Sequence, residues 1–486
     1  MTTSQHIDVR RLSRARRGVL ALLAICMAPS IPAKAETISG ALARAYVNNP
    51  NLNQQRAAVR GLDENVPKAR AGWLPTIGLT GYAGRSYLYQ RDPPPRKSVP
   101  DPGVDPADDE STKPPRGQKF RSFPKGYGIS VSQPIFDGFK TLNSLRQAES
   151  QVFGGRADLR SVEQDTLMGG VTSYMDVLRD TAILGLRGNN VEVLKEQVRQ
   201  TRARGAIGQA TETDVAQAEA ALAQGRSEYF AARGALQASM ATYRQIVGVE
   251  PRALQPARSL EALLPERLDH AIEIGQREHP AIASAMHAVD AAAAAVKVAE
   301  AALYPTASIA GAVNRDLDSE GMTGKKSFTA AIFGQINIPI YQGGMEYASI
   351  RQAKEQLGQA RFVVDVQRNQ IRANVGAAWA QLQAARSLID SSKAAVTAAE
   401  IALSGIRSEA LVGQRTTFDI LTAQQTLLNN RVALVMAQRE RVVASYAILA
   451  AIGRLTAVDL GIASQIYDPK PHFDQVKGRL FGTRAP

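Results

Sequence analysis

The sequence QPIFDG, at residues 133–138, joins a strand-like segment to a long segment with helical periodicity. A close copy, IPIYQG, occurs 205 residues later, at 338–343. The same separation relates further pairs without a gap: Tyr174 and Trp379, Gly208 and Gly413, Asp214 and Asp419, and Gly248 and Gly453. A repeat of this length indicates a duplicated unit of strands and helices, and the other segments can be placed around its two copies.

The two copies differ in length upstream of this motif. There the separation becomes 230 residues, as two pairs show: Pro50 with Pro280, and Arg85 with Arg315. The first copy therefore carries an insertion of 25 residues between Arg85 and Gln133. We predict a first repeat over 36–250, a second repeat over 251–460, and a tail over 461–486 that packs against the helical body.

The first 35 residues show the order of features found in a secretory signal. Five arginines between positions 10 and 17 precede an apolar run at 18–28, and a small-residue sequence, Ala-Lys-Ala, ends at position 35. We predict that residues 1–35 are an export signal, with an ordinary buried helix as the alternative. Cys26 follows Ile25 rather than a small residue, which argues against a lipidated cysteine.

Charge and cysteine content exclude several classes of function. The formal net charge is +13, and it falls to about +8 without residues 1–35. No run of basic residues is interleaved with aromatic residues, so nucleic-acid binding is not expected. Without Cys26 the chain has no thiol for disulfides or for thiolate metal clusters.

Catalysis is not expected either. Beyond the predicted signal the chain has four histidines: His270, His279, His287 and His472. They form no paired-histidine zinc motif, and the chain has no nucleophile elbow and no phosphate-binding glycine loop. We therefore predict no enzymatic activity, no cofactor and no metal site.

Four segments of about ten residues alternate apolar with small or polar side chains. The first two begin at 76 and 126, and the second copy repeats them around 307–313 and 332–340. This pattern is typical of membrane-spanning β-strands, although a half-solvated soluble sheet shares it. Four strands cannot close a barrel in lipid, so several chains would have to share one, and three chains would supply twelve strands.

Helical periodicity predicts four helices in the first copy, at 39–48, 50–72, 138–204 and 211–247. The third is about 100 Å long, and it meets the fourth, of about 55 Å, at a turn over 205–209. The second copy repeats these lengths, with its turn at 412–415. No apolar run past the signal reaches 18 residues, so no transmembrane helix is expected. A solid coiled coil is the alternative. The glycines within the long helix argue against it, because glycine destabilises a helix relative to alanine.

Residues 88–119 contain eight prolines among many charged residues. Such a segment cannot bury enough apolar area to offset the entropy lost on ordering. It accounts for the insertion in the first copy. We predict a mobile loop over 88–119.

The duplicated motif at 133–138 and 338–343, together with the segment 413–419, resembles the TolC family of outer-membrane efflux and secretion channels. The resemblance covers essentially the whole chain after the signal. It implies a mainly α fold with a small β part. Three chains would form an α-barrel tunnel of about 100 Å, joined to a twelve-stranded outer-membrane β-barrel with four strands from each chain.

The same resemblance implies a function. Family members serve as exit ducts for type I protein secretion and for tripartite efflux of drugs and small toxic compounds. They work with a periplasmic adaptor and an inner-membrane ABC or RND transporter, and they contact outer-membrane lipids. We therefore expect a homotrimer in the bacterial outer membrane that extends into the periplasm. The alternatives are a lipidated, pump-specific drug or metal channel of the same fold and a periplasmic coiled-coil scaffold.

The resemblance also implies a periplasmic gate that is closed by polar links between helix pairs. Thr213 and Asp214 match the acceptor side of these links, Arg415 matches the donor, and Asp419 matches an acidic ring at the constriction. As the alternative, Asp214 and Asp419 are capping residues, because each follows a threonine by three positions at a helix start.

This sequence departs from the family pattern at two positions. Ala410 stands where the family has a linking tyrosine, and Thr422 stands where it has a second ring of aspartates. These departures imply a more weakly held gate and a ring that is less selective for cations.

Six residues at the two helical turns match the docking tips that the family offers to its adaptor: Ala206, Ile207, Gly208, Leu411, Val412 and Gly413. As the alternative, the two glycines supply the positive φ that often follows a helix.

Overall fold

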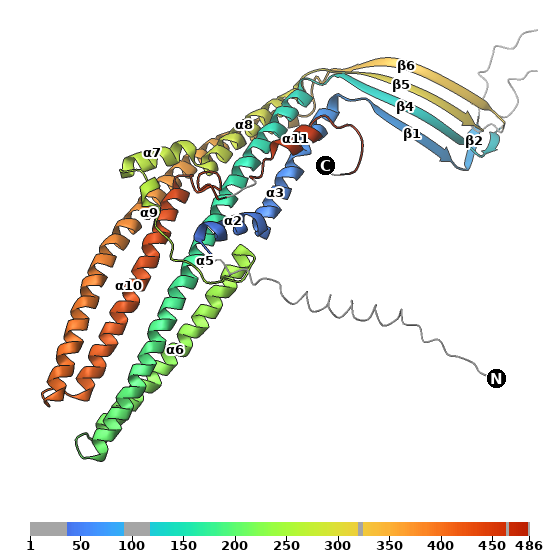
Figure 1. The fold of residues 1–486 in the computed structure, drawn as a ribbon. Coiled ribbons are helices and arrows are strands. Elements are labelled where there is room, and N and C mark those ends of the chain that lie inside the picture. Colours follow the sequence, from blue (N-terminus) through green and yellow to red (C-terminus); the bar gives the residue numbers. More distant parts are fainter. Residues whose placement is uncertain (1–35, 92–116, 319–323, 463–465, 485–486) are drawn as a thin grey trace, which may run out of the picture. The chain divides into compact units, whose positions relative to one another are not determined.

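The computed structural model describes residues 36–91, 117–318, 324–462 and 466–484 (Figure 1). The predicted export signal lies outside the described residues, as does most of the predicted proline-rich loop. The described chain forms two compact units. The sheet unit holds the described residues of 54–161, 276–372 and 467–486, and the helical unit holds those of 1–53, 162–275 and 373–466.

The sheet unit contains a four-stranded antiparallel sheet in the order β1-β4-β5-β6 (Figure 1). Its strands are β1 (Thr76–Ala83), β4 (Lys125–Phe136), β5 (Thr306–Leu317) and β6 (Lys326–Asn337). Two strands come from each copy of the repeat, as the alternation predicted, and β4 pairs with β5 across the copies. Among the described strands, β1 and β6 each have one edge without a neighbour.

The register sorts side chains onto two different faces of this sheet, because directly paired residues share a face. One row across the sheet is Ile77, Val131, Gly311 and Ile332, and the next is Leu79, Ile129, Val313 and Ala330. We call this side the apolar face. The polar face carries small and polar residues, as in the row Thr80, Gly128, Asn314 and Thr329.

Strands occupy both described ends of the predicted loop over 88–119. β2 (Ser86–Arg91) and β3 (Gly117–Ser122) pair as a separate antiparallel ribbon, so the prediction was wrong at both ends of this segment. Tyr87 and Tyr89 favour extended backbone, which outweighs the polar composition around them.

Prolines give the two copies different strand ends. β6 ends at Asn337, whereas the alternation predicted a strand through Ile340. Pro339 has no N–H to donate to a strand ladder, which explains the early end. In the first copy β4 passes through Pro134, because the register with β5 shifts between Pro134 and Phe136.

The predicted helix over 50–72 is divided in the structure. Its parts are α3 (Pro50–Asp63), α4 (Asn65–Arg70) and the 3₁₀ turn η1 (Ala71–Trp73). Pro67 explains the break, because it cannot donate to the Asp63 carbonyl one turn earlier and its ring crowds that carbonyl. A proline within the first turn of α4 is tolerated.

Two helical hairpins have the lengths that the periodicity predicted. α5 (Lys140–Ala206) and α9 (Met345–Leu411) are each 67 residues long, which corresponds to about 100 Å. The chain returns along α6 (Glu212–Val247) and α10 (Thr417–Ala451). The fold is therefore mainly helical with a small β part, as expected.

Close helix contacts explain some of the glycines in α5. A Cβ added at Gly155 would lie 2.5 Å from Leu62 Cδ1, and one added at Gly170 would lie 2.8 Å from Leu42 Cδ2. Gly185 differs, because no neighbouring atom lies within 4 Å of its added Cβ. Glycine thus brings α5 close to α3 at one level and to α2 (Ile38–Asn48) at another.

Tyr174 of α5 organises the core of the helical unit. Its side chain is fully buried, and its hydroxyl lies 2.8 Å from Glu36 O and 2.7 Å from Gln255 O. α5 thereby holds both the segment before α2 and the segment after α6. Burial raises the pKa of Tyr174 to about 12, so the hydroxyl remains a hydrogen-bond donor at neutral pH.

Among the described residues, one helical stretch, Leu268–Leu303, has the length and composition of a membrane-spanning helix, because it contains an 18-residue window with a mean hydropathy of 1.3. His279 and Pro280 divide it into α7 (Leu268–Glu278) and α8 (Pro280–Glu300), followed by the 3₁₀ turn η4 (Ala301–Leu303). Much of its apolar character comes from alanine, as at 291–295. Small side chains suit close helix packing.

The tail contains a further helix, α11 (Lys470–Val476), which packs in the sheet unit. Val476 is fully buried. Phe473 packs against an apolar cluster made of Val66, Ala148 and Val152.

Candidate functional site

Each long helix ends in a turn with the same hydrogen-bond pattern. After α5, the Gly208 amide donates to Gly205 O at 3.0 Å, and the Gln209 amide donates to Arg204 O at 2.8 Å. The turn after α9 repeats both bonds around Gly413, at 3.2 and 3.0 Å. This pattern is the Schellman motif, which closes a helix with a left-handed residue.

Glycine is needed at both turns because of backbone conformation. Gly208 has φ +74° and Gly413 has φ +80°. A Cβ added at either position would meet no atom within 4 Å. The positive φ therefore accounts for these glycines, rather than a close neighbour.

Apolar side chains are exposed at both turns. The exposed fractions are 69% for Ile207, 79% for Leu411 and 71% for Val412, and Ala206 is exposed as well. The structure thus places the six residues predicted as docking tips on the two turns, at the ends of the hairpins (Figure 1). Grouped apolar residues on a surface are typical of a site for a partner.

Capping boxes begin the two returning helices. The Thr211 amide donates to Asp214 Oδ2 at 3.0 Å, and the Asp214 amide donates to Thr211 Oγ1 at 3.1 Å. Thr416 and Asp419 form the same box at the start of α10, at 2.9 and 3.2 Å. The capping alternative is therefore present in the structure, and it satisfies amides that a helix start leaves without partners.

Both aspartates are held in their charged form. Hydrogen bonds from the Thr211 amide and then its hydroxyl lower the pKa of Asp214, and those from the Thr416 amide and hydroxyl lower the pKa of Asp419. Two acidic groups therefore stand beside the turns at neutral pH. Thr213, the second residue of α6, is exposed, and its side chain forms no hydrogen bond within the part of the chain that the structure describes.

Arg415 pairs with a residue that we did not predict. Its Nε donates to Glu409 Oε2 at 2.7 Å, and both side chains are about half exposed. This bond and the nearby carboxylates of Glu409 and Asp419 raise the pKa of Arg415. Between described residues, no hydrogen bond joins Arg415 to Thr213 or Asp214. Glu409 precedes Arg415 by six residues, so a search for charge in the last turn of α9 could have found it.

A family model described as outer membrane efflux protein matches residues 41–249 and 272–454. The chain belongs to this family. The outer membrane efflux protein BepC of Brucella suis biovar 1 is 42% identical to it over 454 residues, which are 93% of each chain. The outer membrane protein TolC of Escherichia coli K12 is 23% identical over 88% of this chain and 84% of that protein.

The fold of this outer membrane efflux protein agrees with solved channels. The Campylobacter jejuni CmeC outer membrane channel covers 91% of this chain, with 89% of its own length, at a TM-score of 0.72 and 16% identity. The resemblance inferred from the duplicated motif is thus confirmed, as is the expected location in the outer membrane. Family and fold are those of a channel protein. In the described ranges, no three His, Cys, Asp or Glu side chains lie close enough to hold a metal ion.

The two positions that depart from the family pattern have different surroundings in this efflux protein. Ala410 is buried in an apolar cluster between α9 and α10, with Leu403 and Ile420. Thr422 is exposed one helical turn after Asp419, and the two line an open groove of about 300 Å³ between α9 and α10. A small residue at 410 therefore serves packing of the hairpin.

An ion-pair cluster in the helical unit was not predicted. Glu261 accepts hydrogen bonds from Arg386 of α9, at 2.8 Å, and from Arg441 of α10, at 2.7 Å. The bond from Arg441 is the main reason that the pKa of Glu261 falls to about 2. The partners lie 125 and 180 residues away along the chain, so no local spacing indicates the cluster.

Proposed function

We propose that three copies of this chain form one outer-membrane duct through which cargo leaves the periplasm. The observation that carries this proposal is the four-stranded sheet, which has one apolar face and unpaired edges at β1 and β6. In lipid, an open edge leaves backbone N–H and C=O groups unsatisfied. Three sheets would pair every edge and close a barrel of twelve strands.

The cargo that we propose is of two kinds: proteins of type I secretion, and drugs or small toxic compounds of tripartite efflux. The name of the relative BepC refers to efflux, which supports the second kind. The inner-membrane partner is an ABC or RND transporter, which a periplasmic adaptor links to the duct. Deletion and restoration of the gene test this assignment. Deletion should raise sensitivity to dyes and detergents or remove a secreted protein from the medium. A deletion strain that shows neither of these changes would contradict the assignment.

We also propose that Thr213, Asp214, Arg415 and Asp419 form the gate of this duct. All four lie at the turns or in the first turn of the returning helices. The pair of Arg415 with Glu409 is solvent-exposed, so Arg415 can exchange partners at low cost. In the closed trimer Arg415 would donate to Thr213 and Asp214 of a neighbour, and Asp419 would place negative charge in the aperture.

Single-channel conductance in a planar bilayer tests the duct and the gate together. We expect a small conductance for the purified wild-type trimer and a larger one for Arg415→Ala. Arg407→Ala is the matched control, because Arg407 is an exposed arginine of α9, in the turn of helix that precedes Leu411 and the turn of Arg415. A folded Arg415→Ala trimer with unchanged conductance would rule out the gate, and a folded wild type without conductance would rule out the duct.

The exposed apolar turns support docking of the adaptor at the hairpin ends, and docking would untwist the helix pairs. A charge at the turns should weaken docking, because an apolar contact surface does not tolerate a desolvated carboxylate. We expect Ile207→Asp with Leu411→Asp to abolish capture of the adaptor in a pull-down. Leu480→Asp places the same charge on an exposed leucine of the tail and should leave capture intact. Capture that survives both turn substitutions would count against docking there.

A further inference from the structure

Positive charge gathers at one end of the apolar face. We call the end of the sheet away from η1 and α5 the outer end; β4 and β6 begin there, and β5 ends there. Lys125 pairs across to Leu317, which pairs with Lys326, and Arg315 lies in the next row. These three cations therefore occupy two neighbouring rows on one face. All three side chains are exposed.

No carboxylate neutralises this cluster on its own face. Within the described parts of β1, β4, β5 and β6, no position of the apolar face holds Asp or Glu. Asp316 lies on the polar face, where its Oδ1 accepts from the Tyr82 hydroxyl at 2.9 Å. Asp318 follows β5, and its Oδ1 accepts from the Gly324 amide at 2.6 Å. In the described chain, the three cations have no ion-pair partner.

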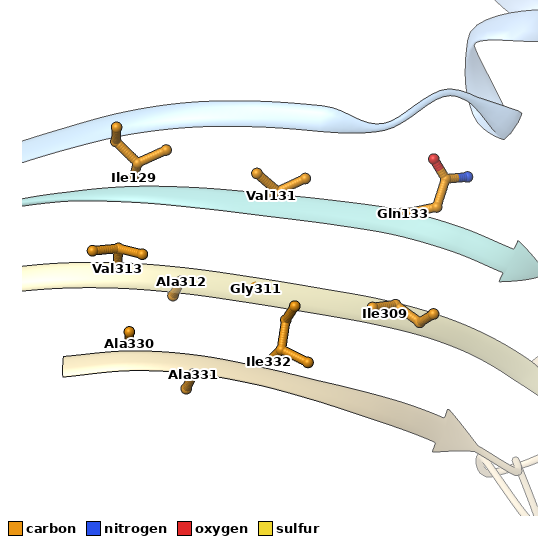
Figure 2. Close-up of a pocket in the computed structure, with 10 residues that line it drawn as sticks. All are labelled: Ile129, Val131, Gln133, Ile309, Gly311, Ala312, Val313, Ala330, Ala331 and Ile332. Atoms are coloured by element: carbon orange, nitrogen blue, oxygen red, sulfur yellow. The ribbon is translucent and has the colours of Figure 1, made fainter.

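An apolar groove of about 580 Å³ lies on the same face, next to the cations. Its floor is at Gly311, which pairs with Val131 on one side and Ile332 on the other. Figure 2 shows Ile129, Val131 and Ile332 on this side of the strands, whereas Ala312 and Ala331 point to the opposite side. No charged residue lines the groove. The groove and the cations together offer a long apolar surface that ends in positive charge.

Two aromatic residues separate the groove from the outermost cations. Tyr127 and Phe328 pair with Arg315 from the two neighbouring strands, and both rings are exposed. Aromatic residues of this kind mark the level of lipid headgroups on the outside of membrane barrels. Lys125 and Lys326 lie one row beyond this level, and the groove lies below it. In the duct proposed above, on which this inference rests, the outer end of the apolar face would reach the headgroups of the outer leaflet.

We propose that this surface binds a phosphorylated, multi-acyl lipid of the outer leaflet. Lys125, Arg315 and Lys326 hold its phosphate, and the groove around Gly311 holds an acyl chain. Lys and Arg are the side chains that pair best with phosphate, and apolar burial fixes the chain. The site is separate from the gate, so its test does not depend on gating.

The test measures binding of purified full-length trimer to lipid A, a bisphosphorylated, multi-acyl glucosamine lipid, by native mass spectrometry in detergent. Each cation near an anionic headgroup contributes about a fivefold change in affinity, so Lys125→Gln with Arg315→Gln and Lys326→Gln should weaken binding about 100-fold. Dephosphorylated lipid A should bind wild type and the triple variant equally. Inorganic phosphate should not displace the lipid.

A control variant separates this site from a general effect of charge. Lys354→Gln with Arg361→Gln and Arg372→Gln removes the same charge from exposed positions of α9 and should bind lipid A as wild type does. Unchanged binding by the strand variant, equal weakening by the α9 variant, or displacement by inorganic phosphate would each overturn the proposal. If the strand variant does not assemble, the single variant Arg315→Gln is used to test the proposal. Its binding of lipid A should be weaker than that of wild type by about fivefold.

Discussion

Glu261 links two helices of the helical unit through one carboxylate. The hydrogen bonds from Arg441 and Arg386 lower its pKa from the ordinary 4.5 to about 2. A pKa that is lower in the folded state means that the carboxylate stabilises the fold above about pH 4.5. This contribution is lost as the pH falls from about 4.5 to about 2.

We expect Glu261→Ala to lower the free energy of unfolding by about 1 kcal/mol at pH 7, because solvent screens this partly exposed cluster. The difference from wild type should shrink at pH 3. Urea unfolding of the protein in detergent, followed by circular dichroism at both pH values, measures it. Glu266→Ala, an exposed neighbour in the same segment, is the control. An equal loss of stability at both pH values would be inconsistent with this role.

Gly138, in the motif at the end of β4, is more crowded by neighbouring atoms than Gly343, its counterpart in the second copy. Its φ is +67°, and an added Cβ would lie 2.7 Å from Tyr304 Cβ and 2.8 Å from Ala301 O. Gly343 has a similar φ of +74°, but nothing lies within 4 Å of its added Cβ. The two glycines therefore separate the cost of conformation from the cost of crowding.

We expect Gly138→Ala to destabilise the protein by about 3 kcal/mol and Gly343→Ala by about 1 kcal/mol, since the first meets backbone atoms as well as an unfavourable φ. Thermal unfolding of both variants beside wild type measures the difference. If both variants lose the same stability, crowding at Gly138 is not the cause.

Residues whose partners are close in sequence were predictable. The pairs Thr211 with Asp214 and Thr416 with Asp419 follow from a spacing of three at a helix start. The role of Glu261 could not be predicted, because its partners are distant in sequence and nothing in the sequence distinguishes it from an exposed glutamate. The roles proposed for Thr213 and Arg415 involve neighbouring chains and remain predictions.

At the scale of elements, α11 is anchored by a buried carboxylate. His472 Nδ1 lies 2.8 Å from Asp63 Oδ2, and Arg156 Nη2 lies 3.8 Å from Asp63 Oδ1. The Arg156 guanidinium also lies over the Phe473 ring, 5.0 Å from its centre. Asp63 is fully buried, so this one side chain connects α3, α5 and α11.

We expect Asp63→Ala to release α11, because it leaves Arg156 and His472 without their acceptor, and breaking a buried pair costs about 3 to 5 kcal/mol. Hydrogen–deuterium exchange should then become faster at residues 470–477. Asp474→Ala removes an exposed pair with Lys477 on the same helix and should change exchange little. Protection of α11 that survives Asp63→Ala would argue against this anchor.

Long elements were predictable because many residues contribute to their periodicity. The hairpins of α5 with α6 and of α9 with α10 agree with the periodicity, and so do the four strands of the main sheet. The predictions were wrong where one or two residues determine the bounds of a helix or a strand. Pro67 divides the helix that begins at Pro50, and two tyrosines extend the ribbon of β2 and β3 into a segment that composition assigned to a loop.

At the scale of the whole molecule, the membrane should distinguish the two faces of the sheet. Ile332 lies on the apolar face, and the adjacent Ala331 lies on the polar face; both are exposed in one chain. We expect Ile332→Lys to destabilise the assembled protein by about 2 to 4 kcal/mol, because it places a charge in lipid. Ala331→Lys places the same charge on the polar face and should cost much less.

Urea midpoints of the two lysine variants, refolded into lipid vesicles, measure this difference. The variants share one strand and one added charge, so each controls for the other. Equal midpoints would mean that the apolar face does not contact lipid. The pattern of alternation could predict that such a face exists, but only the register shows that all four strands place it on the same side.

The unequal crowding at Gly138 and Gly343 has an evolutionary consequence. The two copies of the repeat share this junction between strand and helix, but in this chain the first is enclosed by Ala301 and Tyr304 and the second is not. Selection should therefore remove nearly every substitution at the first junction, whereas the second remains open to drift. Lengthening or diversification of the duct wall in descendants should accordingly begin at residues 338–344.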